Sequence, residues 1–61
     1  MAEKLTEHTY GSSIYMKIRL DNGCIEEITA YIRGTGWSYR TSADHAPEYR
    51  ARIIKAFHDL Y

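Results

Sequence analysis

Apolar and polar residues alternate along two neighbouring stretches of this chain. Residues 13–20 carry an apolar side chain at every second position from Ile14 to Leu20. Residues 24–33 alternate again, and Ile28 lies on their apolar side. A period of two is typical of a half-buried β-strand, because successive side chains of a strand point to opposite faces. The two stretches therefore predict two strands, joined by a turn at Asp21-Asn22-Gly23.

The length of this turn decides which residues of the two strands pair. A two-residue loop would put the two apolar rows on opposite faces of the hairpin. A three-residue loop, with Gly23 in the left-handed conformation, pairs Leu20 with Cys24 and brings both rows to one face. It also places Lys17 opposite Glu27, which is a favourable cross-strand pair. The pattern therefore predicts the three-residue loop.

A third strand and a helix follow. Gly34-Thr35-Gly36 predicts a second turn, and with Thr35-Gly36 as its loop Tyr39 falls opposite Ile32. Trp37 then lies on the same inner face, at the start of a strand over residues 37–42. In the last segment Asp44 can cap a helix, and Pro47 fits the first turn, where its missing N–H has no intrahelical acceptor. Helical spacing places the apolar residues of this segment in one stripe: Tyr49, Ile53, Ala56, Phe57 and Leu60.

These elements predict an α+β fold, a three-stranded antiparallel β-meander with one C-terminal α-helix packed on one face. Residues 12–61 form the expected single small domain. Residues 1–11 are polar and mixed in charge, so we expect a flexible N-terminal lead-in. The expected core combines the inner rows of the strands with the helix stripe: Ile14, Met16, Ile18, Leu20, Ile28, Ile32, Trp37, Tyr39, Tyr49, Ile53, Phe57 and Leu60.

Composition narrows the class of protein further. The 61 residues hold eight Lys and Arg against eight Asp and Glu, so attraction to nucleic acid has to come from local clustering. Cys24 is the only cysteine, which excludes an internal disulfide and favours a reducing, cytoplasmic compartment. No run approaches the ~20 apolar residues of a membrane span. We therefore expect a cytoplasmic protein without a membrane-spanning segment.

No residue pattern in the chain indicates an enzyme, a metal site or a cofactor. His45 lies three residues before Glu48, a spacing that suits two metal ligands on a helix, but no second pair completes a coordination shell. His8 and His58 have no such neighbour pattern. Cys24 begins a predicted strand and not a helix, so nothing local would lower its thiol pKa for catalysis. We expect no catalytic activity, no metal and no cofactor.

The predicted outer face of the sheet gathers basic and aromatic side chains. Glu27 is the one acidic residue that the three expected strands place there. Such a face suits a protein partner, since Tyr and Arg are enriched at interface hot spots, and it also suits phosphates and stacked bases. The candidate binding residues are Tyr15, Lys17, Arg19, Tyr31, Arg33 and Arg40.

The leading hypothesis is a small stand-alone protein-binding module. It would act as an inhibitor or modulator of a larger protein or nucleoprotein complex by steric occlusion. Chains of this size are common in phages and mobile elements, which suggests an anti-defence role. The alternative is a nucleic-acid-binding regulator that uses the same outer face. A homodimer is a further expectation, because the apolar arc of the helix is wider than a small sheet needs and the sheet has open edges.

Overall fold

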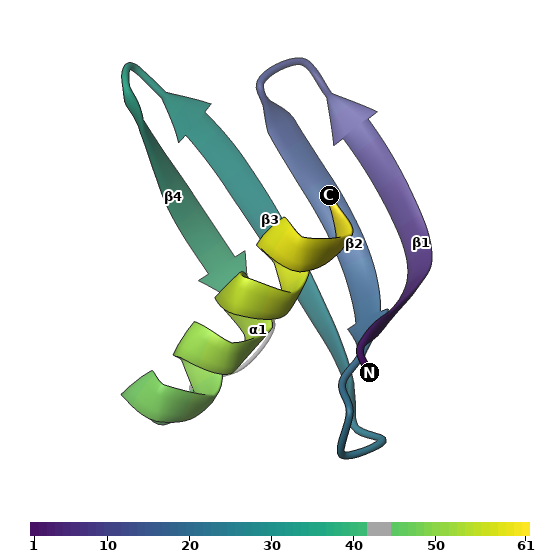
Figure 1. Cartoon of the computed structure of the whole chain (residues 1–61). Coiled ribbons are helices and arrows are strands. Elements are labelled where there is room, and N and C mark those ends of the chain that lie inside the picture. Colours follow the sequence, from purple (N-terminus) through teal and green to yellow (C-terminus); the bar gives the residue numbers. More distant parts are fainter. Residues whose placement is uncertain (42–44) are drawn as a thin grey trace.

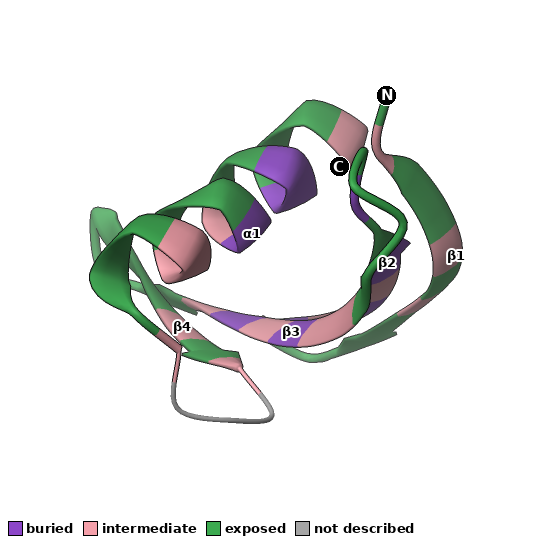
Figure 2. Cartoon of the chain, turned by 90° about the horizontal axis from the view of Figure 1, so that it is seen from below, coloured by how far each residue is buried: buried purple, intermediate pink, exposed green. Residues whose placement is uncertain are grey.

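The computed structural model describes residues 1–41 and 45–61, and it shows an antiparallel sheet with one helix on its concave face (Figures 1 and 2). The four strands lie in the sheet in the order in which they follow along the chain. The helix comes last and crosses the sheet obliquely. The elements are β1 (Glu3–Tyr10), β2 (Ser13–Arg19), β3 (Ile25–Arg33), β4 (Gly36–Thr41) and α1 (Pro47–Leu60).

The α+β class with an antiparallel meander and a C-terminal helix is confirmed, but the sheet has four strands where the pattern predicted three. The additional strand is β1, which occupies most of the expected lead-in, residues 1–11. Its residues Lys4, Glu7 and Thr9 pair with the buried row of β2 and so share the inner face. Because these inward positions are polar, β1 shows no apolar alternation that would reveal a strand.

The β2–β3 hairpin has the predicted register. Leu20 donates its backbone N–H to the Cys24 carbonyl at 2.8 Å, and Gly23 has a φ of 90° in the three-residue loop between them. Lys17 stands opposite Glu27, as expected. The apolar rows of both strands therefore face the same side and form one surface for the helix to cover.

The β3–β4 turn differs from the expectation by two residues. Gly34 and Thr35 form the loop, so Trp37 stands opposite Ile32, and Tyr39 opposite Ala30 instead of Ile32. The reason is the left-handed backbone at Gly34, with a φ of 56°, since a two-residue turn of type II′ requires glycine at its first loop position. A shift by two keeps every side chain on its expected face.

The core lies between α1 and the concave faces of β2 and β3 (Figure 2). Ile53 and Phe57 of α1 are fully buried against the apolar rows of the two strands. Pro47 opens the helix, as predicted, and Ala46 is the N-cap residue, without a side-chain capping bond. Asp44, the expected cap, lies outside the described residues. The buried apolar residues are Ile14, Met16, Ile18, Leu20, Ile28, Ala30, Ile53, Ala56 and Phe57.

Two expected core residues are not buried. Ile32 is 43% exposed and Trp37 is 38% exposed, because only the C-terminal end of α1 reaches this part of the sheet, where Phe57, His58 and Tyr61 contact the Trp37 ring. The expected core residues Tyr39, Tyr49 and Leu60 are half-buried at the core's margin. No helix in the described part of the chain is long and apolar enough to cross a membrane.

Shortening a side chain at the helix–sheet contact should lower the stability of the protein at Ile53 but hardly at its neighbour Ile54. Ile53→Val deletes a buried group, and we expect a cost of about 1 kcal/mol in the free energy of unfolding. Ile54→Val is the matched control. Because Ile54 is only half-buried, this variant should lower the free energy of unfolding by only a few tenths of a kcal/mol. Urea unfolding followed by circular dichroism measures both. Equal losses at the two positions would contradict the described packing.

Candidate functional site

The register places all six candidate binding residues on the convex face of the sheet, opposite α1, which we call the outer face. Lys17 pairs with Glu27 across β2 and β3, and Arg40 of β4 stands opposite Thr29. Period-two alternation is sufficient to put them on one face. The six residues are Tyr15, Lys17, Arg19, Tyr31, Arg33 and Arg40.

The outer face is more basic than the rest of the molecule. Among the described residues its cationic side chains are Lys17, Arg19, Arg33 and Arg40, and its carboxylates are Glu3 and Glu27. Because the whole chain has eight charges of each sign, the remaining positions hold four cations and six carboxylates. The neutral chain is therefore polarised across the sheet, with a formal excess of two positive charges on the outer face.

Part of this surface is already neutralised internally. Arg19 Nη1 donates to Glu3 Oε1 at 2.7 Å, a pair that required β1 and so could not be foreseen. Tyr15 Oη donates to Glu27 Oε1 at 2.7 Å. This hydrogen bond, together with burial, raises the pKa of Tyr15 above its ordinary value. At this end of the face Tyr15 and Arg19 are therefore held by neighbouring carboxylates.

The other end of the face, beside the β3–β4 hairpin, carries positive charge without such partners. In the described residues neither Arg33 nor Arg40 is paired with a carboxylate. The Arg33 guanidinium lies 5.8 Å from the centroid of the Tyr31 ring. A shallow hollow at the margin of the sheet is lined by Tyr31, Arg33, Ser38, Tyr39 and Arg40. Two guanidinium groups thus flank hydroxyl-bearing side chains, an arrangement suited to an anionic group.

A row of rings runs along the β1 side of the outer face. His8 stacks with Tyr10 and with Tyr15, with centroid separations of 6.1 and 6.3 Å. Strand β1 thus adds His8 to the outer face, opposite Tyr15. The sequence did not predict this, because residues 1–11 were expected to form a flexible lead-in. The aromatic content of the outer face is larger than the sequence indicated.

A second group of polar side chains lies on the inner side, under the start of α1. Tyr49 Oη donates to Glu26 Oε2 at 2.7 Å. His45 Nε2 lies 3.3 Å from Glu26 Oε1 without hydrogen-bond geometry, and the rings of His45 and Tyr49 contact edge to face. Glu26 interrupted the apolar row of its strand in the sequence, and its role is to hold the helix through Tyr49. The sequence suggested Glu48 as the neighbour of His45, whereas the structure gives Glu26.

The hydrogen bond to Glu26 raises the pKa of Tyr49 to about 12, with contributions from burial and from Cys24. The pKa rises because ionisation of Tyr49 removes the O–H that donates to Glu26 and leaves a phenolate next to a carboxylate. His58 differs from His45: it contacts the Tyr39 hydroxyl and packs edge-on against Trp37. No set of three or more His, Cys, Asp or Glu side chains within the described ranges is placed to hold a metal ion.

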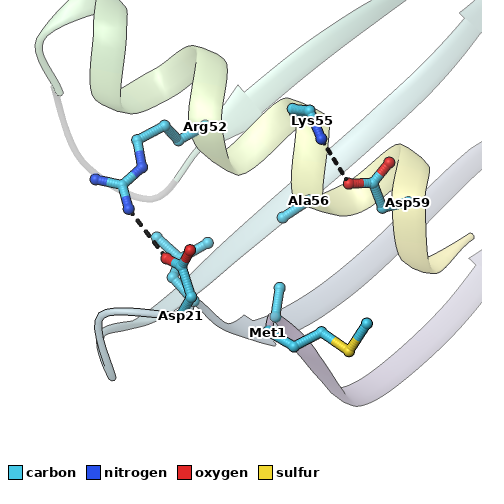
Figure 3. A pocket seen from close by; sticks show the side chains of 8 residues that line it. Met1, Asp21, Arg52, Lys55, Ala56 and Asp59 are labelled. Atoms are coloured by element: carbon cyan, nitrogen blue, oxygen red, sulfur yellow. Dashed lines mark hydrogen bonds and ion pairs between the residues drawn. The ribbon is translucent and has the colours of Figure 1, made fainter.

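A further hollow lies between α1 and the end of β2, and Figure 3 shows its lining. Its charged residues form two ion pairs, Arg52 with Asp21 and Lys55 with Asp59, each at 3.0 Å. All four side chains are more than half exposed. With its charges already paired and no enclosed apolar wall, this hollow favours no ligand.

Comparisons with protein-family models, with curated protein sequences and with solved structures give no match for this chain. The surface chemistry of the outer face is therefore the feature that points to a function.

The raised pKa of Tyr49 has a consequence in alkaline solution. A tyrosine whose pKa is higher in the folded state stabilises the fold below its ordinary value of 10.0, and that contribution disappears as pH rises towards about 12. Tyr49→Phe lacks both the bond to Glu26 and the ionisation. We therefore expect the difference in ultraviolet absorbance between the wild type and Tyr49→Phe, followed against pH, to show one tyrosine that titrates near pH 12. A difference spectrum that titrates near pH 10 would contradict the Tyr49–Glu26 bond.

Proposed function

We propose that this protein is a binding module that docks its outer face on a larger protein or protein complex and modulates it by steric occlusion. The observation that carries the proposal is the mosaic of aromatic, hydroxyl and basic side chains over the convex side of the sheet. Tyr and Arg supply large contact areas and directional hydrogen bonds, which is why they dominate protein interfaces. The hollows described above are shallow, which favours recognition by a surface over enclosure of a small molecule.

A carboxylate near the middle of the outer face favours a protein over a nucleic acid. Glu27 stands opposite Lys17 and accepts the Tyr15 hydroxyl, so it is fixed in place on the surface. A phosphate backbone that crossed the face would meet this negative charge. A protein surface of mixed polarity can match it with a cation or a hydrogen-bond donor.

A nucleic acid is the second candidate, and a specific observation supports it. The guanidinium groups of Arg33 and Arg40, which pair with no carboxylate among the described residues, lie on the same face as the stacked rings of His8, Tyr10 and Tyr15. Cations that contact phosphates beside rings that stack on bases are a common arrangement in single-strand binding. Both candidates use the outer face, and they differ in how strongly salt should weaken the complex.

Tyr31 and Arg40 are the expected anchors for a protein partner. Interface anchors cost about 2 kcal/mol or more each when truncated, so Tyr31→Ala/Arg40→Ala should weaken binding on the order of 1000-fold. Quantitative mass spectrometry of proteins captured on the immobilised variants measures the loss. The control, Arg52→Ala/Lys55→Ala, removes two exposed cations from α1 and should capture the same partner as the wild type. A partner that the Tyr31/Arg40 variant retains in full would contradict the proposal, provided that thermal melts show both variants folded.

Salt dependence separates the two candidates. We expect no saturable binding of fluorescent single-stranded or duplex DNA at physiological salt, measured by anisotropy. If Lys17, Arg33 and Arg40 contacted three phosphates of duplex DNA, log affinity would fall against log salt with a slope of about −2.7, at about −0.9 per contact. Such a slope, lost in the triple alanine variant, would replace the protein partner with a nucleic acid.

A further inference from the structure

The free edge of β4 is open over part of its length. β4 is the last strand of the sheet, and in an antiparallel pair the residues that exchange hydrogen bonds alternate. Ile32 donates its N–H to the Ser12 carbonyl at 2.9 Å, so the even-numbered residues of β3 bond with β2 and the odd-numbered ones with β4. Their partners on β4 include Ser38, and Trp37 and Tyr39 therefore turn their N–H and C=O groups to the free edge.

One of these edge groups is occupied. Arg50 of α1 donates Nη2 to the Tyr39 carbonyl at 2.9 Å, so the helix closes the edge at that point. On Trp37 and Tyr39, the groups still directed outward without a partner among the described residues are the Trp37 N–H and C=O and the Tyr39 N–H. Unpaired strand groups of this kind are a template for another strand. The open part of the edge is the half next to the β3–β4 hairpin.

The outer side of this edge is cationic. The hollow lined by Tyr31, Arg33, Ser38, Tyr39 and Arg40 lies there. Arg33 stands opposite Gly36, which has no side chain to lie between Arg33 and the edge. Negatively charged side chains on an adjoining strand would lie on the same side of the sheet as the two arginines.

The inner side of the same edge is mainly aromatic, with His58 of α1 against the rings of Trp37 and Tyr39. Trp37 and Tyr39 face inward there, with their rings stacked at a centroid distance of 6.4 Å. Trp37 is 38% exposed and its cross-strand neighbour Ile32 is 43% exposed. Surface of this type gains from contact with an apolar side chain. A strand bound at this edge would therefore need acidic side chains on its outer side and apolar side chains on its inner side.

We infer that the β4 edge binds an extended acidic segment of the partner protein, which adds to the sheet as a fifth strand. In that segment acidic residues alternate with apolar ones. The acidic side chains lie on the outer side with Arg33 and Arg40, and the apolar side chains lie on the inner side with Trp37. This inference rests on the proposed function and names the part of the partner that is recognised.

A second copy of this chain fits the edge less well. Pairing β4 with β4 would bring Arg33 and Arg40 of both copies to the same side of the joint with no carboxylate between them. Pairing β4 with the other edge strand, β1, would place Lys4 and Glu7 on the inner side beside Trp37. A charged side chain there would be desolvated against the indole. A foreign strand with apolar inward residues avoids both costs.

An eight-residue peptide of alternating glutamate and valine, with blocked ends, is the probe. Titrated into the ¹⁵N-labelled protein, it should shift the amide signals of Trp37 and Tyr39 more than those elsewhere in the sheet. Trp37 is the only tryptophan, so its fluorescence should change at the same peptide concentrations. A peptide of alternating lysine and valine is the charge control and should leave both signals unchanged.

Two variants test the role of charge. Arg33→Ala/Arg40→Ala should weaken peptide binding at least tenfold, whereas Arg52→Ala/Lys55→Ala, which removes two cations paired with Asp21 and Asp59, should not. Gly36→Glu places a carboxylate opposite Arg33, and a Cβ there meets no atom closer than 4.0 Å, so this variant should fold and compete with the peptide.

The outcomes separate this inference from the proposed function. Shifts confined to β4 and lost with Arg33 and Arg40 support the inference. If the peptide fails to bind, or shifts only the signals of residues around Tyr15 and Lys17, the β4 docking site is wrong. The proposed function is not affected by that result, because the capture experiment with Tyr31→Ala/Arg40→Ala tests it separately. If a thymidine oligonucleotide shifts the same β4 signals and the acidic peptide does not, both the strand partner and the protein partner are wrong.

Discussion

The contact between one short helix and the concave side of the sheet is the constraint on which the rest of the structure depends. Phe57 and Ile53 fill the space over β2 and β3, and in a domain of this size a core of this extent supplies only a few kcal/mol of net stability. The helix has 14 residues and one face, so it can bury the apolar rows of two strands but not of four. The two outer strands therefore receive less cover, and β4 meets α1 only at the margin of the core, through Trp37 and Tyr39.

The two edge strands meet this condition differently. β1 directs Lys4 and Glu7 inward, where they pair with each other at 2.9 Å, and a bulge between Lys4 and Thr6 interrupts its register. Inward charges and bulges both discourage pairing with another strand, so β1 is a protected edge. β4 has neither feature, and it keeps Trp37 partly exposed. The asymmetry between the edges is why docking is proposed at β4 and not at β1.

The sequence predicted best where burial under α1 enforces alternation. The pairing of Leu20 with Cys24 and of Lys17 with Glu27 followed from matching two apolar rows, and the outer-face residues followed from the same alternation. Strand β1 was not predicted because its inward residues are polar, and its only local signal is the Gly11-Ser12 hairpin loop.

Two further features depend on tertiary structure that the alternation does not encode. Trp37 was expected in the core since its face was correct, but face alone does not say how far a helix reaches along a sheet. The contact of Tyr49 with Glu26 joins positions 23 residues apart, and no local pattern encodes such a distance.

The position of Arg50 bears on how the outer face and the β4 edge can act together. Its bond to the Tyr39 carbonyl ties α1 to the middle of β4, so a strand added at the hairpin half of the edge meets a rigid stop there. A bound segment is then short and must gain most of its affinity from side chains, because few backbone groups remain to pair. Charge on Arg33 and Arg40 and apolar contact with Trp37 supply those interactions on opposite sides of one strand. Specificity in such a site arises from the alternation itself, since a strand shifted by one residue would direct its carboxylates at the indole and its apolar side chains at the arginines.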